Sequence, residues 1–188
     1  MPKVRAVTVY LASSSRAPDD LMELARELGW GLAERDWALV YGGARVGLMG
    51  ALADATLAAG GRVEGVILDT FSQVAHAGLH ELETVTDMRA RKASLAHRGD
   101  AFVVLPGAFG TLEEVSEILV ERQIGRHTKP LILVNHEGFW GPLLAQFDRM
   151  VDARLLDASN RELLVVVEDV RAALDRIQAY ETEPTLPR

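Results

Sequence analysis

The chain has 188 residues, of which 48% are hydrophobic and 25% are charged, and it contains no cysteine. This length and composition fit one folded domain, and the missing cysteine excludes disulfides, thiolate metal sites, iron–sulfur clusters and a cysteine nucleophile. The 20 Lys and Arg against 27 Asp and Glu give a net charge of −7, which argues against a nucleic acid or an anionic membrane as partner.

Short apolar runs rich in Val, Ile and Leu alternate with longer amphipathic segments. The apolar runs predict six strands, at residues 4–11, 38–41, 63–68, 101–105, 130–135 and 163–167. The amphipathic segments predict helices at residues 18–32, 48–59, 87–98, 111–124, 139–154 and 170–180. Residues 69–86 have no clear period and are predicted to form a loop, with a short edge strand at 83–85.

This order of elements predicts an α/β domain of the three-layer, Rossmann-like, doubly wound type with a mostly parallel sheet. The domain is expected to span residues 1–180, followed by a frayed tail at 181–188 that contains two prolines. Ligands of such domains bind at the carboxyl ends of the strands. The loops after Leu11, Tyr41, Leu68 and Leu105 are therefore the places to look for a site.

No membrane or export segment is expected. The apolar run near the start of the chain ends at Ser13, which is too short for the core of a signal peptide. The longest apolar stretches also fall short of the ~20 residues that a membrane-spanning helix needs. We therefore expect a cytoplasmic protein.

Two of the loops are glycine-rich and lead directly into a predicted helix. Their sequences are Gly-Gly-Ala-Arg-Val-Gly-Leu-Met-Gly at 42–50 and Pro-Gly-Ala-Phe-Gly-Thr at 106–111. Glycine lets the backbone approach a ligand, and the free N–H groups of a helix start suit a phosphate. Neither loop has the dinucleotide fingerprint or the P-loop pattern. A plain turn and a phosphate cradle both remain open for each loop.

Three cations lie near the start of the helix predicted from Asp87, where the helix dipole disfavours positive charge. These cations are Arg89, Arg91 and Lys92. Asp87 and Arg91 have the i,i+4 spacing of a pair on a solvated face, but an anionic ligand would also explain the cations. Arg91 and Lys92 differ in direction by about 100°, so only one of them can point straight into a pocket.

Thr111 and Glu114 have the spacing of a capping box, in which both side chains bond to the backbone at a helix start. A carboxylate one turn above a phosphate-binding turn is also well placed for acid–base catalysis, or for stabilising an oxocarbenium ion on an attached sugar. The spacing alone does not separate these two roles.

Together these segments resemble the LOG (Lonely Guy) family of cytokinin riboside 5′-monophosphate phosphoribohydrolases, a family that also carries the label "possible lysine decarboxylase". The resemblance rests on the glycine-rich stretch 42–50, on Met-Arg-Ala-Arg-Lys at 88–92 and on Pro-Gly-Ala-Phe-Gly-Thr-Leu-Glu-Glu at 106–114. The segment 125–130 is also similar, and the likeness covers roughly residues 4–180.

The resemblance implies hydrolysis of the N-glycosidic bond of a cytokinin riboside 5′-monophosphate or an AMP-like nucleotide, which releases a free base and ribose 5-phosphate. It also implies a homodimer that needs neither a metal nor an organic cofactor. The family's catalytic arginine and glutamate fall on Arg91 and Glu114. The implied substrate- and phosphate-binding residues are Ser13, Gly42, Gly43, Gly47, Met49, Lys92, Pro106, Gly107, Ala108, Phe109, Gly110 and Thr111.

Four positions depart from the family pattern, and one of them is Ala12, which stands where a glycine usually precedes the loop at Ser13. Ala108 stands where a second glycine is usual, and a positive φ there would cost alanine on the order of 1 kcal/mol. Gln73 and Val120 stand where plant-type members have a glutamate and a threonine. These departures leave two alternatives open: a nucleotide-binding or carrier protein of the same fold, and a phosphoribohydrolase for a different base. The five histidines show no ligand spacing, so no metal site is expected.

Overall fold

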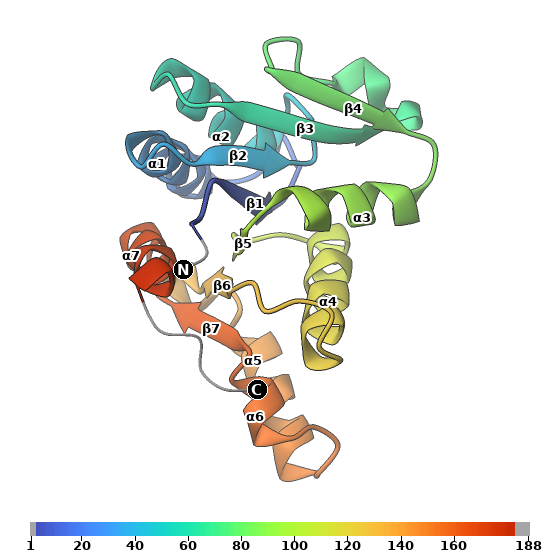
Figure 1. Cartoon of the computed structure of the whole chain (residues 1–188), viewed down its shortest axis with the longest axis vertical. Coiled ribbons are helices and arrows are strands. Elements are labelled where there is room, and N and C mark those ends of the chain that lie inside the picture. Colours follow the sequence, from blue (N-terminus) through green and yellow to red (C-terminus); the bar gives the residue numbers. More distant parts are fainter. Residues whose placement is uncertain (1–2, 183–188) are drawn as a thin grey trace.

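The computed structural model describes residues 3–182, which form a seven-stranded sheet flanked by helices (Figure 1). Every strand pair is parallel, and the order across the sheet is β4-β3-β2-β1-β5-β6-β7. The strands are β1 (Ala6–Tyr10), β2 (Ala38–Tyr41), β3 (Val63–Leu68), β4 (Glu81–Val85), β5 (Ala101–Val104), β6 (Leu131–Val134) and β7 (Leu164–Val167). The predicted doubly wound α/β fold is confirmed.

Helices cover both faces of the sheet and make a three-layer arrangement. The helices are α1 (Asp19–Glu34), α2 (Gly47–Ala58), α3 (Met88–Arg98), α4 (Phe109–Gln123), α5 (Gly141–Asp152), α6 (Ala158–Arg161) and α7 (Val170–Thr182), with 3-10 turns η1 (Asp69–Val74) and η2 (His136–Gly138). Buried side chains of α1, α2 and α7 pack on one face, and buried side chains of α3 and α4 with partly buried ones of α5 pack on the other. Figure 1 shows the two groups on either side of the strands.

Strand β5 illustrates why these strands are apolar throughout. Its side chains alternate between the two faces, so Val103 contributes to the core under α1, whereas Phe102 and Val104 contribute to the core under α3 and α4. All four residues of the strand are buried. A parallel strand that is covered on both faces therefore reads as a continuous hydrophobic run.

Strand β4 is longer than the predicted edge strand at 83–85, and it pairs with β3 along its whole length. The sequence shows no clear hydrophobic period over this strand because two of its side chains are glutamates. Arg98, on α3, contacts Glu81 at 2.7 Å, Glu83 at 3.0 Å and Glu64 of β3 at 2.8 Å. These ion pairs attach α3 to the outer strands, in addition to the apolar contacts of Leu95.

Several element ends differ from the prediction. Helix α4 begins two residues earlier than expected, and α5 begins two residues later because the turn η2 occupies part of the segment before it. The short helix α6 was not predicted. Of the tail expected at 181–188, the first two residues belong to α7, and 183–188 lie outside the described residues. Within the described part of the chain, no helix combines the length and the apolar character required to cross a bilayer.

Candidate functional site

A cavity of about 370 Å³ opens at the carboxyl edge of the sheet, where β1, β2, β3 and β5 end. This is the edge at which the sequence predicts a ligand, and the volume is in the range of small-molecule sites. The lining residues come from the loops after these strands and from α2, α3 and α4. They are Leu11, Ala12, Ser13, Ser14, Gly42, Ala44, Val46, Met49, Ile67, Phe71, Val74, Arg91, Ala108, Gly110, Thr111 and Glu114.

A second cavity, of about 500 Å³, lies at the opposite edge of the sheet. Its lining includes Arg5 and Trp37, which precede β1 and β2. Parallel sheets do not bind their ligands at the amino ends of the strands. The smaller cavity at the carboxyl edge is therefore the candidate site.

The centre of the candidate site is an ion pair between Arg91 of α3 and Glu114 of α4. Arg91 Nη1 lies 3.0 Å from Glu114 Oε1, and the two side chains are only 11% and 8% exposed. Arg91 Nε also donates a hydrogen bond of 3.1 Å to the carbonyl oxygen of Val66, at the end of β3. Two contacts on different elements therefore hold the guanidinium at the cavity wall.

The pKa of the buried Glu114 carboxyl group differs from that of an exposed glutamate. Burial raises the pKa of Glu114 to about 7, although the charge of Arg91 and its hydrogen bond act in the opposite direction. The carboxyl group therefore changes its charge near neutral pH. A carboxyl group with such a pKa, in a cavity and beside an arginine, is typical of catalytic sites.

Gly42 provides the space that the guanidinium of Arg91 occupies. A Cβ atom at this position would lie 2.5 Å from Arg91 Nη2 and 2.9 Å from the Cε atom of Met49. Both distances are shorter than real contacts allow. The glycine at the end of β2 thus leaves room for the ends of the Arg91 and Met49 side chains, which an alanine would displace.

The second wall of the site is the start of α4. The helix begins at Phe109, with Ala108 as its N-cap and no side-chain cap. The first intrahelical bond at this end joins the N–H of Leu112 to the carbonyl oxygen of Ala108. The N–H groups of residues 109–111 are therefore without intrahelical acceptors beside the cavity, and a helix start of this kind suits an anion.

The capping-box alternative is wrong because Thr111 lies inside α4 and not at its N-cap. Its side chain packs beside Gly107, where a Cβ atom would lie 2.1 Å from Thr111 Oγ1. Glu114 turns instead toward Arg91. The expected strain at Ala108 is also absent, because its φ is −110°, a conformation that any residue adopts.

The structure brings eight of the fourteen predicted site residues to the cavity. They are Ser13, Gly42, Met49, Arg91, Ala108, Gly110, Thr111 and Glu114. The other six, Gly43, Gly47, Lys92, Pro106, Gly107 and Phe109, do not line it. Of these six, Lys92 and Gly47 have other contacts, and Phe109 is exposed to solvent.

Lys92 pairs with two glutamates of α4 rather than with the cavity. Its Nζ lies 2.8 Å from Glu113 and 2.5 Å from Glu117, and these hydrogen bonds raise the pKa of Lys92. Gly47 has a φ of +58°, and a Cβ there would lie 2.4 Å from the carbonyl oxygen of Ser14. Phe109 points into solvent, with 89% of its surface exposed.

An apolar part of the lining was missed by the sequence analysis. Ile67 lies near the end of β3, and Phe71 and Val74 lie on η1, in the segment predicted to be a loop. The position of this segment directly after a strand end was the available signal. Gln73 lies on the same turn but is absent from the lining, and its carbonyl oxygen accepts a hydrogen bond from Arg45.

Comparison with known proteins finds a matching family model and relatives that cover nearly the whole chain. Residues 49–177 match a family model described as "Possible lysine decarboxylase". A cytokinin riboside 5′-monophosphate phosphoribohydrolase of Rhodococcoides fascians is 39% identical over 181 residues, which are 95% of this chain and 91% of that protein. An enzyme of the same name from Arabidopsis thaliana is 36% identical over 183 residues, which are 96% and 84% of the two chains.

Solved structures of the same fold have lower sequence identity. The molybdenum cofactor carrier protein of Chlamydomonas reinhardtii aligns with a TM-score of 0.76 and 22% identity, over 96% of this chain and all of that one. The molybdenum cofactor binding protein of Rippkaea orientalis aligns with a TM-score of 0.75 and 19% identity, over 95% and 98%. At these identities the likeness concerns the fold alone.

Proposed function

Because the chain belongs to the LOG family, we propose that it hydrolyses the N-glycosidic bond of a nucleoside 5′-monophosphate and releases the free base and ribose 5-phosphate. The relatives named cytokinin riboside 5′-monophosphate phosphoribohydrolase cover nearly the whole chain at more than a third identity. The substrate class we propose is a cytokinin riboside 5′-monophosphate or an AMP-like nucleotide.

The observation that carries this proposal is the placement of the Arg91–Glu114 pair in the same cavity as the start of α4. The uncapped N–H groups at the start of α4 suit the 5′-phosphate. A phosphate held there brings the ribose of the nucleotide toward Glu114, which lies one turn further along the same helix. The site thus offers the start of α4 to the phosphate, Glu114 to the ribose and Arg91 to the base.

The reaction needs stabilisation of opposite charges on the two fragments. As the bond between C1′ and the base nitrogen breaks, its electron pair leaves with the base and positive charge develops on the ribose. The ionised carboxylate of Glu114 stabilises that positive charge and accepts a proton from the water that bonds to C1′. The guanidinium of Arg91 stabilises the negative charge on the departing base, which then takes up a proton.

The apolar wall formed by Ile67, Phe71 and Val74 favours a substrate whose base is flat or carries an apolar substituent. Phe71 is half-exposed at the rim of the cavity. An adenine or an adenine with a prenyl group fits this chemistry, whereas a charged substituent would lose its hydration there.

The test is to incubate the full chain with AMP and with isopentenyladenosine 5′-monophosphate and to measure the free base. We expect release of base, and Glu114→Gln should lower kcat by about 100- to 10,000-fold while nucleotide binding persists. Glu113→Gln is the matched control, since Glu113 lies next to Glu114 but is half-exposed and pairs with Lys92. Binding of nucleotides without release of base from any of them would favour the carrier alternative and overturn the proposal.

We also propose a homodimer that forms through α4. Phe109, Val120 and Ile124 are 89%, 52% and 57% exposed, and their spacing puts them along one side of the helix. Exposed apolar side chains on one side of a solvated helix favour burial against a second copy. Light scattering of the wild type and of Ile124→Glu tests this, and a monomeric wild type would contradict it.

The expected cytoplasmic location belongs to the proposal and is tested by cell fractionation.

A further inference from the structure

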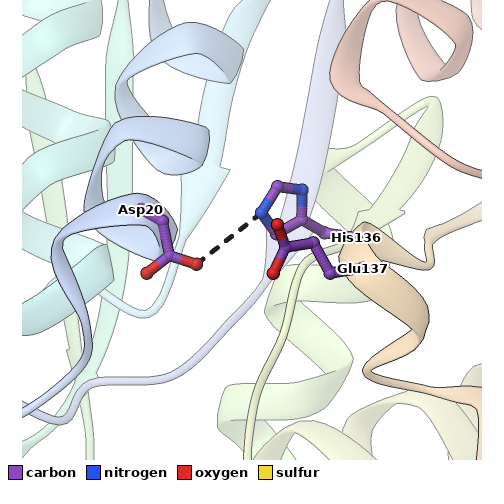
Figure 2. A group of neighbouring side chains, drawn as sticks. All are labelled: Asp20, His136 and Glu137. Atoms are coloured by element: carbon purple, nitrogen blue, oxygen red, sulfur yellow. Dashed lines mark ion pairs between the residues drawn. The ribbon is translucent and has the colours of Figure 1, made fainter.

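Three potential metal ligands meet outside the cavity, at the start of α1 and in the turn between β6 and α5. Figure 2 shows the side chains of Asp20, His136 and Glu137 directed toward one another. Their ligand atoms all lie within 4.8 Å of one another. Asp20 is far from the other two in the sequence, which explains why residue spacing gave no sign of the cluster.

The imidazole of His136 lacks a hydrogen-bond partner where one is needed. Its Nε2 atom is shielded from solvent and accepts or donates no hydrogen bond. The nearest charged atom is Asp20 Oδ2 at 3.8 Å, beyond hydrogen-bond distance. A buried polar atom without a partner is unfavourable, so this nitrogen points to a ligand that bridges it to the carboxylates.

The charges of the cluster also favour a cation. Within residues 3–182, neither Asp20 nor Glu137 pairs with a lysine or an arginine. When His136 is neutral, the cluster carries two uncompensated negative charges within a few ångströms. Such a set attracts a divalent ion, and a neutral imidazole is the form that binds a metal.

Hydrogen bonds span the turn that carries two of the three ligands. The Asn135 side chain accepts a hydrogen bond of 2.8 Å from the N–H of Trp140, and the N–H of Gly138 donates to the carbonyl oxygen of Asn135. Glu137 has a φ of 47° inside this turn. His136 and Glu137 are therefore presented by a fixed backbone, and only Asp20 and Glu137 are exposed enough to adjust freely.

We propose that Asp20, His136 and Glu137 bind a divalent transition-metal ion such as Zn²⁺ or Mn²⁺. One imidazole nitrogen and two carboxylate oxygens match the ligand preferences of these ions, and water completes the coordination. Ligand distances of about 2.0–2.2 Å require only a small inward movement of the exposed carboxylates. Mg²⁺ and Ca²⁺ prefer sites with oxygen ligands alone and bind more weakly here.

The bound ion connects the start of α1 to the turn after β6. None of its three ligands lines the cavity, so the ion is a link between elements of the fold and not a participant in the proposed hydrolysis. Ion binding to the folded chain alone raises the stability of the fold. Unfolding is therefore a readout that does not depend on activity.

The experiment is calorimetric titration of the full chain, after treatment with a chelator, with Zn²⁺, Mn²⁺ and Mg²⁺. We expect one Zn²⁺ or Mn²⁺ per chain, and an affinity at least about tenfold lower in Glu137→Gln and in Asp20→Asn. Asp19→Asn is the matched control, because Asp19 is the exposed neighbour in the same helical turn and lies outside the cluster. Its affinity should equal that of the wild type.

Thermal unfolding gives the second measurement. Zn²⁺ or Mn²⁺ should raise the Tm of the wild type and of Asp19→Asn, and should leave the Tm of Glu137→Gln unchanged. Absence of saturable binding to the wild type overturns the proposal. Binding that is equally tight in Glu137→Gln and Asp20→Asn overturns it too, since the ion would then be held elsewhere.

Discussion

The two glycine-rich turns, β2–α2 and β5–α4, look alike in the sequence but use glycine in different ways. In the β2–α2 turn, Gly43 and Gly47 have positive φ angles, and Gly42 and Gly47 lie against atoms that a side chain would strike. In the β5–α4 turn, neither Gly107 nor Gly110 has a positive φ. A Cβ atom at Gly110 would meet nothing within 4 Å, although one at Gly107 would strike the side chain of Thr111.

A glycine-rich loop can therefore mark close packing or an open helix start, and the sequence alone does not distinguish the two. The β2–α2 turn needs glycine for its own packing and for the room it gives Arg91. The β5–α4 turn needs an uncapped helix start beside the cavity, and it tolerates Ala108 at the N-cap. The β2–α2 turn makes room for the side chain of Arg91. The β5–α4 turn is the surface that we propose contacts the phosphate.

The largest effect is expected where the two turns meet, at the Arg91–Glu114 pair. The pKa of Glu114 is about 7 in the folded chain and about 4.5 when unfolded, so the folded state binds more protons between these values. Stability contributed by this group is therefore present at low pH and is lost as the pH rises toward 7, by about 3 kcal/mol. Urea unfolding at several pH values, compared with Glu114→Gln, measures the loss.

The comparison with Glu114→Gln is essential because another group titrates in the same range. Burial lowers the pKa of His127, which makes stability rise with pH. The difference between wild type and variant removes this contribution. Equal pH dependence of the two proteins would show that Glu114 titrates normally.

The next largest effect concerns the room that Gly42 provides. Gly42→Ala should displace the guanidinium of Arg91 and lower kcat/KM for the nucleotide by about 100-fold, as expected for a misplacement of about 1 Å. Gly141→Ala is the control, since a Cβ there meets no atom within 4 Å. If both variants keep full activity, the β2–α2 turn does not position Arg91.

A smaller effect is expected for two glycine substitutions that distinguish the cost of a steric clash from the cost of a positive φ. Gly47→Ala and Gly60→Ala both place alanine at a positive φ, but only the first drives a Cβ into backbone, at 2.4 Å from Ser14. We expect Gly47→Ala to be less stable than Gly60→Ala by about 2 kcal/mol. Denaturant unfolding measures the stability of both variants. Equal losses of stability would mean that the positive φ alone destabilises Gly47→Ala.

The smallest effect is expected at the second turn. Ala108→Gly restores the glycine that is usual in the family, but φ at this position is −110°, so glycine relieves no strain. Stability should fall by less than about 1 kcal/mol, and kcat/KM should change by no more than about twofold. A large gain in activity would mean that the alanine hinders the substrate.

The sequence predicted most elements because burial on both faces makes strands such as β5 uniformly apolar. It predicted β4 poorly because an edge strand has one exposed side, and its glutamates carry the pairing with Arg98. The start of α4 was misplaced because Thr111 and Glu114 match a local capping pattern, whereas Glu114 contacts Arg91 of α3 and the helix begins at Phe109. Local sequence patterns thus gave wrong predictions where a side chain bonds to a residue that is distant in the sequence.

Most of the candidate site followed from the strand ends, but its central geometry did not. Arg91 and Glu114 are 23 residues apart, and only the packing of α3 beside α4 puts 3.0 Å between their atoms. The raised pKa of Glu114 also depends on burial, which no motif encodes. The family resemblance supplied these two residues, and the structure supplied their mutual contact.

The glutamates of β4 also influence how copies of the protein can associate. A parallel strand added beside β4 would place its own side chains about 5 Å from Glu81 and Glu83. Arg62 and Arg98 offer two positive charges to the three carboxylates of Glu64, Glu81 and Glu83, so the outer edge keeps a net negative charge. A second copy of this edge is repelled, and growth of the sheet from chain to chain into a fibre is blocked at β4.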